Sequence, residues 1–128
     1  EAVKVLDRAS GRLDTALLYV SDHGESLGET GLYLHGVPYR LAPSYQTRVP
    51  MLAWLSQPFR IQARVATDCL ELKAAEPLSH DNLFHSLLGV LDVETSAYAA
   101  ERDLFAGCRL PAERLTQDDA PPPATGGG

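Results

Sequence analysis

Apolar and polar residues follow a helical pattern at the beginning of the chain and a strand pattern directly after it. Residues 2–8 place their apolar side chains on one helical stripe, and Ser10 with Gly11 then supplies a stop signal. After a polar connection, residues 16–20 form an apolar run bounded by polar residues. Such a run is typical of a strand buried on both faces, which indicates a parallel sheet. Helix, strand and a following Gly-rich turn together predict one step of an open α/β fold.

The middle of the chain predicts a loop and a second strand. Residues 26–43 contain three glycines and two prolines, which are too many breakers for one long element. We expect a functional loop with one helical turn there, since loops of this length usually serve a function. Residues 49–55 then predict a strand, and Pro50 fits best at its first residue because it cannot donate to the ladder. Residues 57–77 are weakly patterned.

The most regular helical pattern follows Ser79. This serine can cap a helix whose first turn contains Asp81. The apolar residues that recur at helical spacing are Leu83, Phe84, Leu87, Leu88 and Leu91. The end of the chain contains three consecutive prolines and three terminal glycines. Because this composition cannot bury enough apolar area to offset its ordering entropy, we predict a folded part over residues 1–115 and a disordered tail over residues 116–128.

A carboxylate and an imidazole stand side by side where the first predicted strand stops. Asp22 and His23 occupy the edge at which open α/β sheets bind their ligands. Adjacent strand side chains face opposite ways, so both can bind one metal ion only if the chain turns here, and Gly24 permits that turn. Carboxylate oxygen with imidazole nitrogen suits Zn²⁺, or more weakly Mn²⁺. Spacing alone favours the alternative, in which the carboxylate orients the histidine or caps the next element.

Three further polar residues follow in the sequence, and each can be interpreted either as a structural residue or as a functional one. His35 stands in a Leu-His-Gly sequence, and its spacing alone favours a loop residue that binds no ligand. Glu25 and Glu29 are candidates for acid–base chemistry or for binding an ammonium group. However, Ser26 and Glu29 match a capping box, which favours a role at the start of a helix.

Composition narrows the class of protein. The chain has 128 residues and a formal net charge of −6, which suits one domain at most and disfavours nucleic acid as a partner. No stretch approaches the roughly 20 apolar residues that cross a bilayer, and the N-terminus lacks the layout of a signal peptide. Cys69 and Cys108 are too few for a disulfide scaffold and match no metal knuckle. They either pair or remain buried thiols, according to the compartment.

Three blocks of the sequence resemble the lipid A phosphoethanolamine transferases, the family that includes the mobile colistin-resistance enzymes. The blocks are VSDHGESLGETGLYLHGVPYRLAPSYQTRVPMLAWLS, SHDNLFHSLLGVLDVETSAY and DLFAGCR, and they follow the order of the family. The resemblance covers about residues 1–109. It implies an α/β fold of the alkaline-phosphatase/sulfatase type. This chain is then expected to be the C-terminal portion of the catalytic domain, with a mostly buried sheet flanked by helices.

The resemblance also implies roles for particular residues. Asp22 and His23 match the family's zinc ligands, and His35 matches a histidine of its substrate or second-metal region. The family's nucleophilic threonine and a further metal-binding glutamate belong to upstream blocks, and no threonine here lies in such a block. We therefore expect no catalytic nucleophile in this chain, and little or no turnover by residues 1–128 alone. In an oxidising periplasm Cys69 and Cys108 could form a disulfide, and the sequence leaves this pairing open.

The implied reaction is the zinc-dependent transfer of phosphoethanolamine from phosphatidylethanolamine to a lipid A phosphate, which gives polymyxin (colistin) resistance. The resemblance further implies an N-terminal membrane domain that holds the enzyme at the periplasmic face of the bacterial inner membrane, and we expect a monomer. One alternative is another zinc enzyme of the superfamily, such as a phosphoglycerol transferase, a phosphodiesterase or a sulfatase. A second alternative is a truncated, non-catalytic domain that binds no metal.

Overall fold

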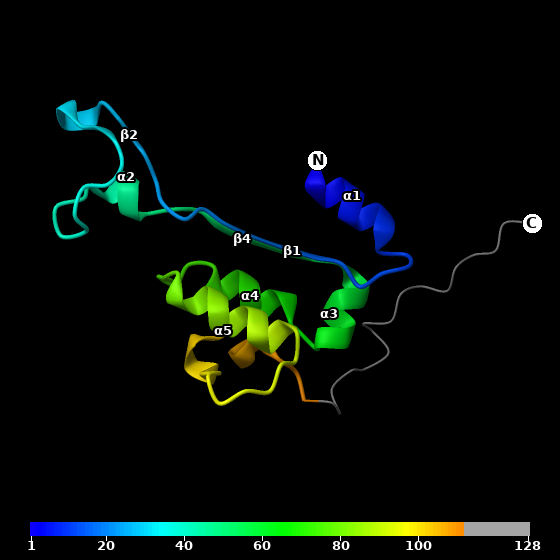
Figure 1. The fold of residues 1–128 in the computed structure, drawn as a ribbon. Coiled ribbons are helices and arrows are strands. Elements are labelled where there is room, and N and C mark those ends of the chain that lie inside the picture. Colours follow the sequence, from blue (N-terminus) through cyan, green and yellow to red (C-terminus); the bar gives the residue numbers. More distant parts are fainter. Residues whose placement is uncertain (112–128) are drawn as a thin grey trace, which may run out of the picture. The chain divides into compact units, whose positions relative to one another are not determined.

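The computed structural model describes residues 1–111, which form short helices and two two-stranded sheets (Figure 1). In chain order the elements are α1 (Ala2–Ala9), β1 (Ala16–Val20), β2 (Ser26–Leu27), the 3-10 turn η1 (Glu29–Gly31), β3 (Tyr33–Leu34), α2 (Ser44–Thr47), β4 (Met51–Leu55), α3 (Gln57–Ala63), α4 (Thr67–Lys73), α5 (Asp81–Val90), η2 (Ala100–Arg102) and η3 (Ala106–Cys108). This content confirms the predicted α/β class. The predicted tail, residues 116–128, lies outside the described residues.

The chain divides into two compact units. One unit comprises Ala16–Trp54, and the other comprises Glu1–Thr15 together with the chain from Leu55 onward. No helix in the described part of the chain combines the length and the apolar character needed to cross a membrane.

Strands β1 and β4 pair with each other, but in the antiparallel sense (Figure 1). Ser56 donates its N–H to the Thr15 carbonyl beyond one end of the pair, and Gly24 donates to the Gln46 carbonyl beyond the other. Residue numbers therefore rise along one strand as they fall along the other, and the expected parallel arrangement is wrong for this pair. The intervening chain contains turns and a hairpin and lacks the crossover helix that parallel neighbours require.

The expectation of a mostly buried sheet is also not met within the described residues. Most residues of β1 and β4 are half-buried, and Tyr19 and Leu52 are exposed. A ladder of two strands covers little of its own faces, so apolar composition alone cannot bury it. Pro50 lies directly before β4 and leaves the ladder intact.

Residues 26–43, where the sequence predicts a functional loop with one helical turn, contain a small hairpin and turns. β2 and β3 pair antiparallel, with Ser26 opposite Leu34. The 3-10 turn η1 between them supplies the expected helical turn. The capping box is not formed, because Ser26 lies in β2 and the Glu29 carboxylate accepts the Leu27 N–H at 2.8 Å.

Two helices lie in residues 57–77, where the sequence is only weakly patterned. The side chain of Ser56 caps α3 by accepting the Phe59 N–H, and Pro58 lies in the first turn. Serine followed closely by proline is a helix start signal, and this signal identifies α3 in hindsight. Helices as short as α3 and α4 contain too few turns for a clear apolar period.

Helix α5 occurs where the sequence predicts a helix, but its buried face is polar. His85 Nδ1 accepts the Ala99 N–H at 3.1 Å, and Ser86 Oγ accepts the Leu104 N–H at 2.9 Å. The exposed residues include members of the predicted apolar stripe, Phe84, Leu87 and Leu91. Ser79 contributes to the start of the helix by accepting the Asp81 N–H.

A disulfide and a small core hold the C-terminal motif. Cys69 of α4 is bonded to Cys108 of η3, with 5.5 Å between their Cα atoms, so the pairing that the sequence left open is formed. Cys108 is buried together with Val65 and Phe105. The disulfide therefore links α4 to a motif that lies 39 residues further along the chain.

A buried carboxylate forms the polar part of the same region. Asp103 accepts hydrogen bonds from Tyr98 Oη and from the Phe105 N–H, each at 2.8 Å, and its Oδ2 lies 3.6 Å from Arg109 Nη2. Gly89 of α5 makes this arrangement possible, because a Cβ atom there would lie 2.0 Å from Asp103 Oδ2. Any larger residue at position 89 would displace the carboxylate.

Candidate functional site

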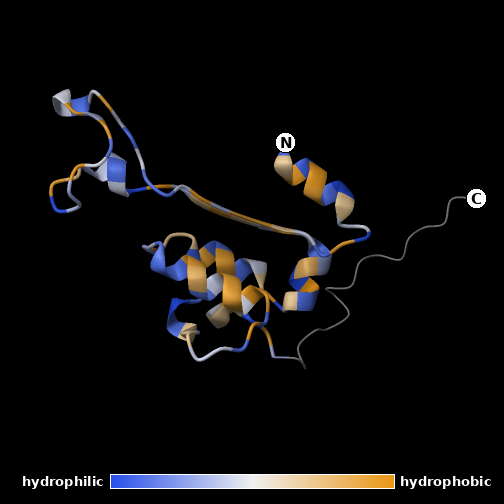
Figure 2. Ribbon diagram, in the orientation of Figure 1, coloured by the Kyte–Doolittle hydropathy of each residue, from blue (hydrophilic) through white to orange (hydrophobic). Residues whose placement is uncertain are grey.

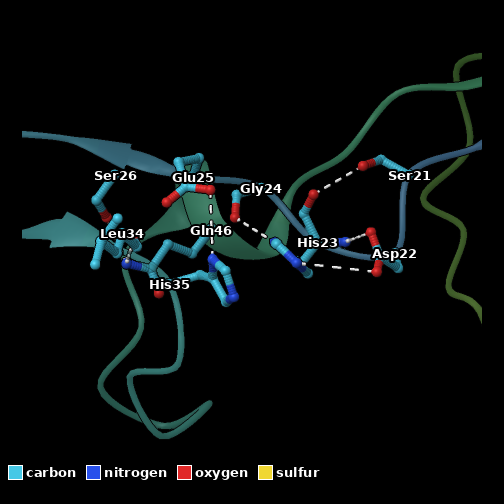
Figure 3. Close-up of polar contacts among 9 residues, drawn as sticks. All are labelled: Ser21, Asp22, His23, Gly24, Glu25, Ser26, Leu34, His35 and Gln46. Carbon is cyan, nitrogen blue, oxygen red and sulfur yellow. Dashed lines mark hydrogen bonds and ion pairs between the residues drawn. The ribbon is translucent and has the colours of Figure 1, made fainter.

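The end of β1 turns so that Asp22 and His23 face each other (Figure 3). Ser21 Oγ donates to the His23 carbonyl at 2.8 Å, and the His23 N–H donates to Asp22 Oδ1 at 3.1 Å. Because of these local bonds, the side chains of Asp22 and His23 do not point to opposite faces, as neighbouring side chains of a regular strand do. The second carboxylate oxygen, Asp22 Oδ2, consequently lies 3.9 Å from His23 Nε2.

A hydrogen bond to the backbone fixes the donor atom of His23. Its Nδ1 lies 2.8 Å from the Gly24 carbonyl oxygen, which can only accept, so Nδ1 carries the proton (Figure 3). In this tautomer of the uncharged ring, Nε2 carries the lone pair, and it is the ring nitrogen that lies 3.9 Å from Asp22 Oδ2. Metal-binding histidines typically use this arrangement, in which the other ring nitrogen donates to a carbonyl or carboxylate. Two ligands of tetrahedral zinc lie about 3.3 Å apart, so small side-chain movements would suffice to bind the ion.

Gly24 is required for close packing and does not adopt a left-handed turn. A Cβ atom at this position would lie 1.9 Å from the Tyr45 carbonyl oxygen. The Gly24 N–H also donates to the Gln46 carbonyl at 2.9 Å. The glycine predicted for the turn therefore lets the segment after His23 approach the backbone of α2.

The structure also brings His35 to the same place. The ring centroids of His23 and His35 lie 4.0 Å apart, and His35 Nδ1 lies 3.3 Å from Glu25 Oε2 (Figure 3). Ligand atoms of His23, Glu25 and His35 lie within 4.8 Å of one another, so these three residues could also hold a metal ion. His23 belongs to both donor sets. The sequence predicted His23 and Asp22 as metal ligands, and the structure adds Glu25 as a further candidate ligand.

The site is open to solvent. The Asp22 side chain is 89% exposed, and those of His23, His35 and Glu25 are about half exposed. A molecule in solution therefore has access to the two histidines in the described part of the chain. The other two histidines of the chain lie elsewhere: His80 is at the start of α5, and His85 is buried in it.

Gln46 is a residue of the site that sequence reasoning missed. It is buried in α2, and its Nε2 donates to Ser26 Oγ and to the Leu34 carbonyl, the latter at 3.1 Å (Figure 3). Leu34 adopts a φ of +66°, which is unusual for a residue with a side chain. No sequence signal marks Gln46, because a glutamine in a polar stretch has no distinctive spacing.

Comparisons with known proteins give the family. Residues 2–93 match the Sulfatase family. Phosphoethanolamine transferase EptA from Escherichia coli K12 is 46% identical over 114 residues, covering 88% of this chain and 21% of that protein. Phosphatidylethanolamine transferase Mcr-1 from E. coli is 41% identical over 105 residues, covering 82% of this chain and 18% of that protein.

A solved structure gives the same result for the fold. The integral membrane protein lipooligosaccharide phosphoethanolamine transferase A from Neisseria meningitidis matches with a TM-score of 0.80 and 45% identity, covering 86% of this chain and 21% of that one. The chain thus spans about a fifth of the length of these relatives. The resemblance and the sulfatase-type fold expected from the sequence are confirmed. The chain belongs to the sulfatase family and, within it, is similar to the phosphoethanolamine transferases.

Proposed function

We propose that the complete protein transfers phosphoethanolamine from phosphatidylethanolamine to a phosphate of lipid A, and that Asp22 and His23 are two ligands of its zinc ion. The observation that supports this most directly is the pairing of His23 Nδ1 with the Gly24 carbonyl. It leaves Nε2 as a lone-pair donor 3.9 Å from Asp22 Oδ2. The names of the relatives support the substrates, since they cite phosphatidylethanolamine and lipooligosaccharide.

The chemistry divides between the ion and the residues of this chain. When bound, zinc would activate the attacking threonine hydroxyl, which the family resemblance assigns to another part of the protein, and would neutralise phosphoryl charge. Asp22 and His23 would hold the ion, and the Gly24 carbonyl keeps the His23 ring in the required tautomer. His35 binds the phosphoethanolamine group of the substrate, and Glu25 orients the His35 ring from 3.3 Å.

The reaction is a transfer in two steps. The threonine oxygen forms a bond to phosphorus while the bond from phosphorus to the glycerol oxygen breaks, and diacylglycerol leaves with a proton. A lipid A phosphate oxygen then attacks the same phosphorus and releases the threonine. The product carries an added ammonium group, which weakens its attraction for polycationic peptides such as polymyxins.

The location follows from the substrates and is consistent with the disulfide. Disulfides form and persist in oxidising compartments such as the periplasm. We therefore propose that the complete protein acts at the periplasmic face of the inner membrane, and that a membrane domain outside this chain holds it there. The similarity to an integral membrane protein supports this location.

Metal content and group transfer test the proposal together. We expect Asp22→Asn and His23→Ala in the complete protein to abolish transfer of labelled headgroup to lipid A and to lower the zinc content. His80→Ala is the matched control, since His80 lies outside the site. Full zinc content in both variants would refute the ligand assignment. Transfer of another headgroup, such as phosphoglycerol, by the unaltered protein would refute the donor assignment.

A further inference from the structure

The hairpin and loop around His35 expose large apolar side chains. Four of them define what we call the apolar loop surface: Tyr33, Leu34, Tyr39 and Leu41, which are between 69% and 83% exposed. All belong to the compact unit Ala16–Trp54, which also contains His23 and His35. Leu34 directly precedes His35, so the chain leads from this surface straight into the candidate site. Figure 2 shows hydrophobic residues along the loop that follows β3.

Backbone hydrogen bonds fix the shape of this surface. The N–H groups of Leu41 and Ala42 both donate to the Pro38 carbonyl, at 2.8 and 3.0 Å, and close a turn that presents Tyr39 and Leu41. The Tyr33 ring lies over Gly28, where a Cβ atom would approach it to 2.8 Å. The buried Gln46 holds the Leu34 carbonyl. An apolar surface held in place by its own backbone is suited to contact another apolar phase.

The charge of this segment differs from that of the rest of the protein. Residues 31–43 contain no carboxylate, and Arg40 is their one formally charged residue, whereas the whole chain has a net charge of −6. Tyrosine is enriched at membrane interfaces, because its ring is apolar and its hydroxyl remains hydrated. A cation beside such a surface is attracted to anionic lipid headgroups. An apolar surface with tyrosines, an arginine and no acid therefore complements a bilayer that contains anionic lipid.

We propose that the apolar loop surface inserts into the interface of the bilayer that contains the phosphatidylethanolamine donor. This inference rests on the proposed function, which makes the donor a lipid with two acyl chains. Insertion of Tyr39 and Leu41 at the level of the headgroups would bring phosphoethanolamine groups to His35, since Leu34 and His35 are consecutive. The loop thereby serves as the contact through which a membrane-embedded substrate reaches a polar site.

Fluorescence at single labelled positions tests the contact independently of activity. The complete protein is placed in nanodiscs of dioleoyl phosphatidylethanolamine and dioleoyl phosphatidylglycerol, with a bimane label on Tyr39→Cys or Leu41→Cys. We expect lipid-attached nitroxide to quench both labels by roughly half or more. Leu72→Cys is the matched control, because Leu72 is 79% exposed but lies in α4, outside the surface. Absence of quenching at both loop positions would overturn the proposal.

Transfer kinetics provide the second measurement. We expect the Tyr39→Ser/Leu41→Ser double variant to lower kcat/KM for dioleoyl phosphatidylethanolamine in vesicles by roughly tenfold. Its kinetics with monomeric dihexanoyl phosphatidylethanolamine should be unchanged, because this donor needs no bilayer. Equal loss with both donors, together with a lower Tm, would mean that another protein segment covers the surface, and would overturn the proposal. Quenching without any headgroup transfer by the unaltered protein would support the membrane contact and refute the proposed function.

Discussion

The side-chain amide of Gln46 donates a hydrogen bond to the backbone carbonyl of Leu34, with 3.1 Å between the two atoms. Leu34 has a left-handed backbone, which is strained for a leucine, and it directly precedes His35. The Gln46 carbonyl in turn accepts the N–H of Gly24, the residue after His23. One buried residue of α2 therefore ties together the two segments that carry the histidines of the candidate site.

Replacing Gln46 should weaken metal binding without removing a ligand. We expect Gln46→Leu to lower the zinc affinity of the complete protein roughly 10- to 100-fold, because the Leu34 carbonyl and Ser26 hydroxyl lose their donor. Competition with a chromophoric chelator measures this affinity. The control is Gln62→Leu, since Gln62 is exposed in α3. Wild-type affinity in the Gln46 variant would show that the amide has no positioning role.

Neutralising Glu25 should separate substrate binding from metal binding. Glu25→Gln keeps a polar group near His35 Nδ1 but removes the negative charge of the Glu25 carboxylate. We expect zinc content to stay at the wild-type level, because Asp22 and His23 are the proposed ligands. The KM for phosphatidylethanolamine should rise several-fold, since His35 loses its orienting partner. A loss of zinc in this variant would instead assign Glu25 and His35 to the metal, as the geometry of the three donor atoms allows.

The disulfide should contribute substantially to stability. Linking Cys69 to Cys108 closes a loop of 39 residues, and the chain-entropy estimate for such a loop is about 4 kcal/mol. We expect the Cys69→Ser/Cys108→Ser double variant to lose most of this free energy of unfolding, as measured by urea denaturation of the complete protein. The reducing agent dithiothreitol should destabilise the wild type and leave the variant unchanged. Equal sensitivity of both proteins would indicate that another disulfide is responsible.

Tyr98 should make stability depend on alkaline pH. Burial, followed by the hydrogen bond to Asp103, raises the pKa of Tyr98 above its usual value of 10.0. The folded protein then holds this proton more tightly than the unfolded chain, so the contribution is fully present below pH 10 and is lost as the pH rises through the folded-state pKa. We expect Tyr98→Phe to flatten the decline in unfolding free energy above pH 10.

The same variant should also be less stable at neutral pH. Tyr98→Phe removes a hydrogen bond to a buried carboxylate, which contributes about 1.5–3 kcal/mol. Urea titrations between pH 7 and 11 measure both effects. Tyr39→Phe is the control, because Tyr39 is 83% exposed. If the two variants have the same pH profile, the bond from Tyr98 to Asp103 does not govern the alkaline transition.

The sequence by itself predicted the elements whose signals are local. The stripe of residues 2–8 and the apolar run of residues 16–20 correspond to α1 and β1. The adjacency of Asp22 and His23 at the end of a strand is likewise a property of consecutive residues. Apolar period, stop signals and neighbouring polar residues act over a few positions, so they can be recognised without knowledge of the chain path.

Only the tertiary structure decided which distant residues meet. It set the antiparallel pairing of β1 with β4, placed Gln46 under Leu34, and brought the His35 ring against His23. It also buried His85 and Ser86 of α5 more fully than the leucines of that helix. Each of these outcomes depends on where the chain turns back and on which backbone groups then need hydrogen-bond partners. Neither can be predicted from the residues that are close in the sequence.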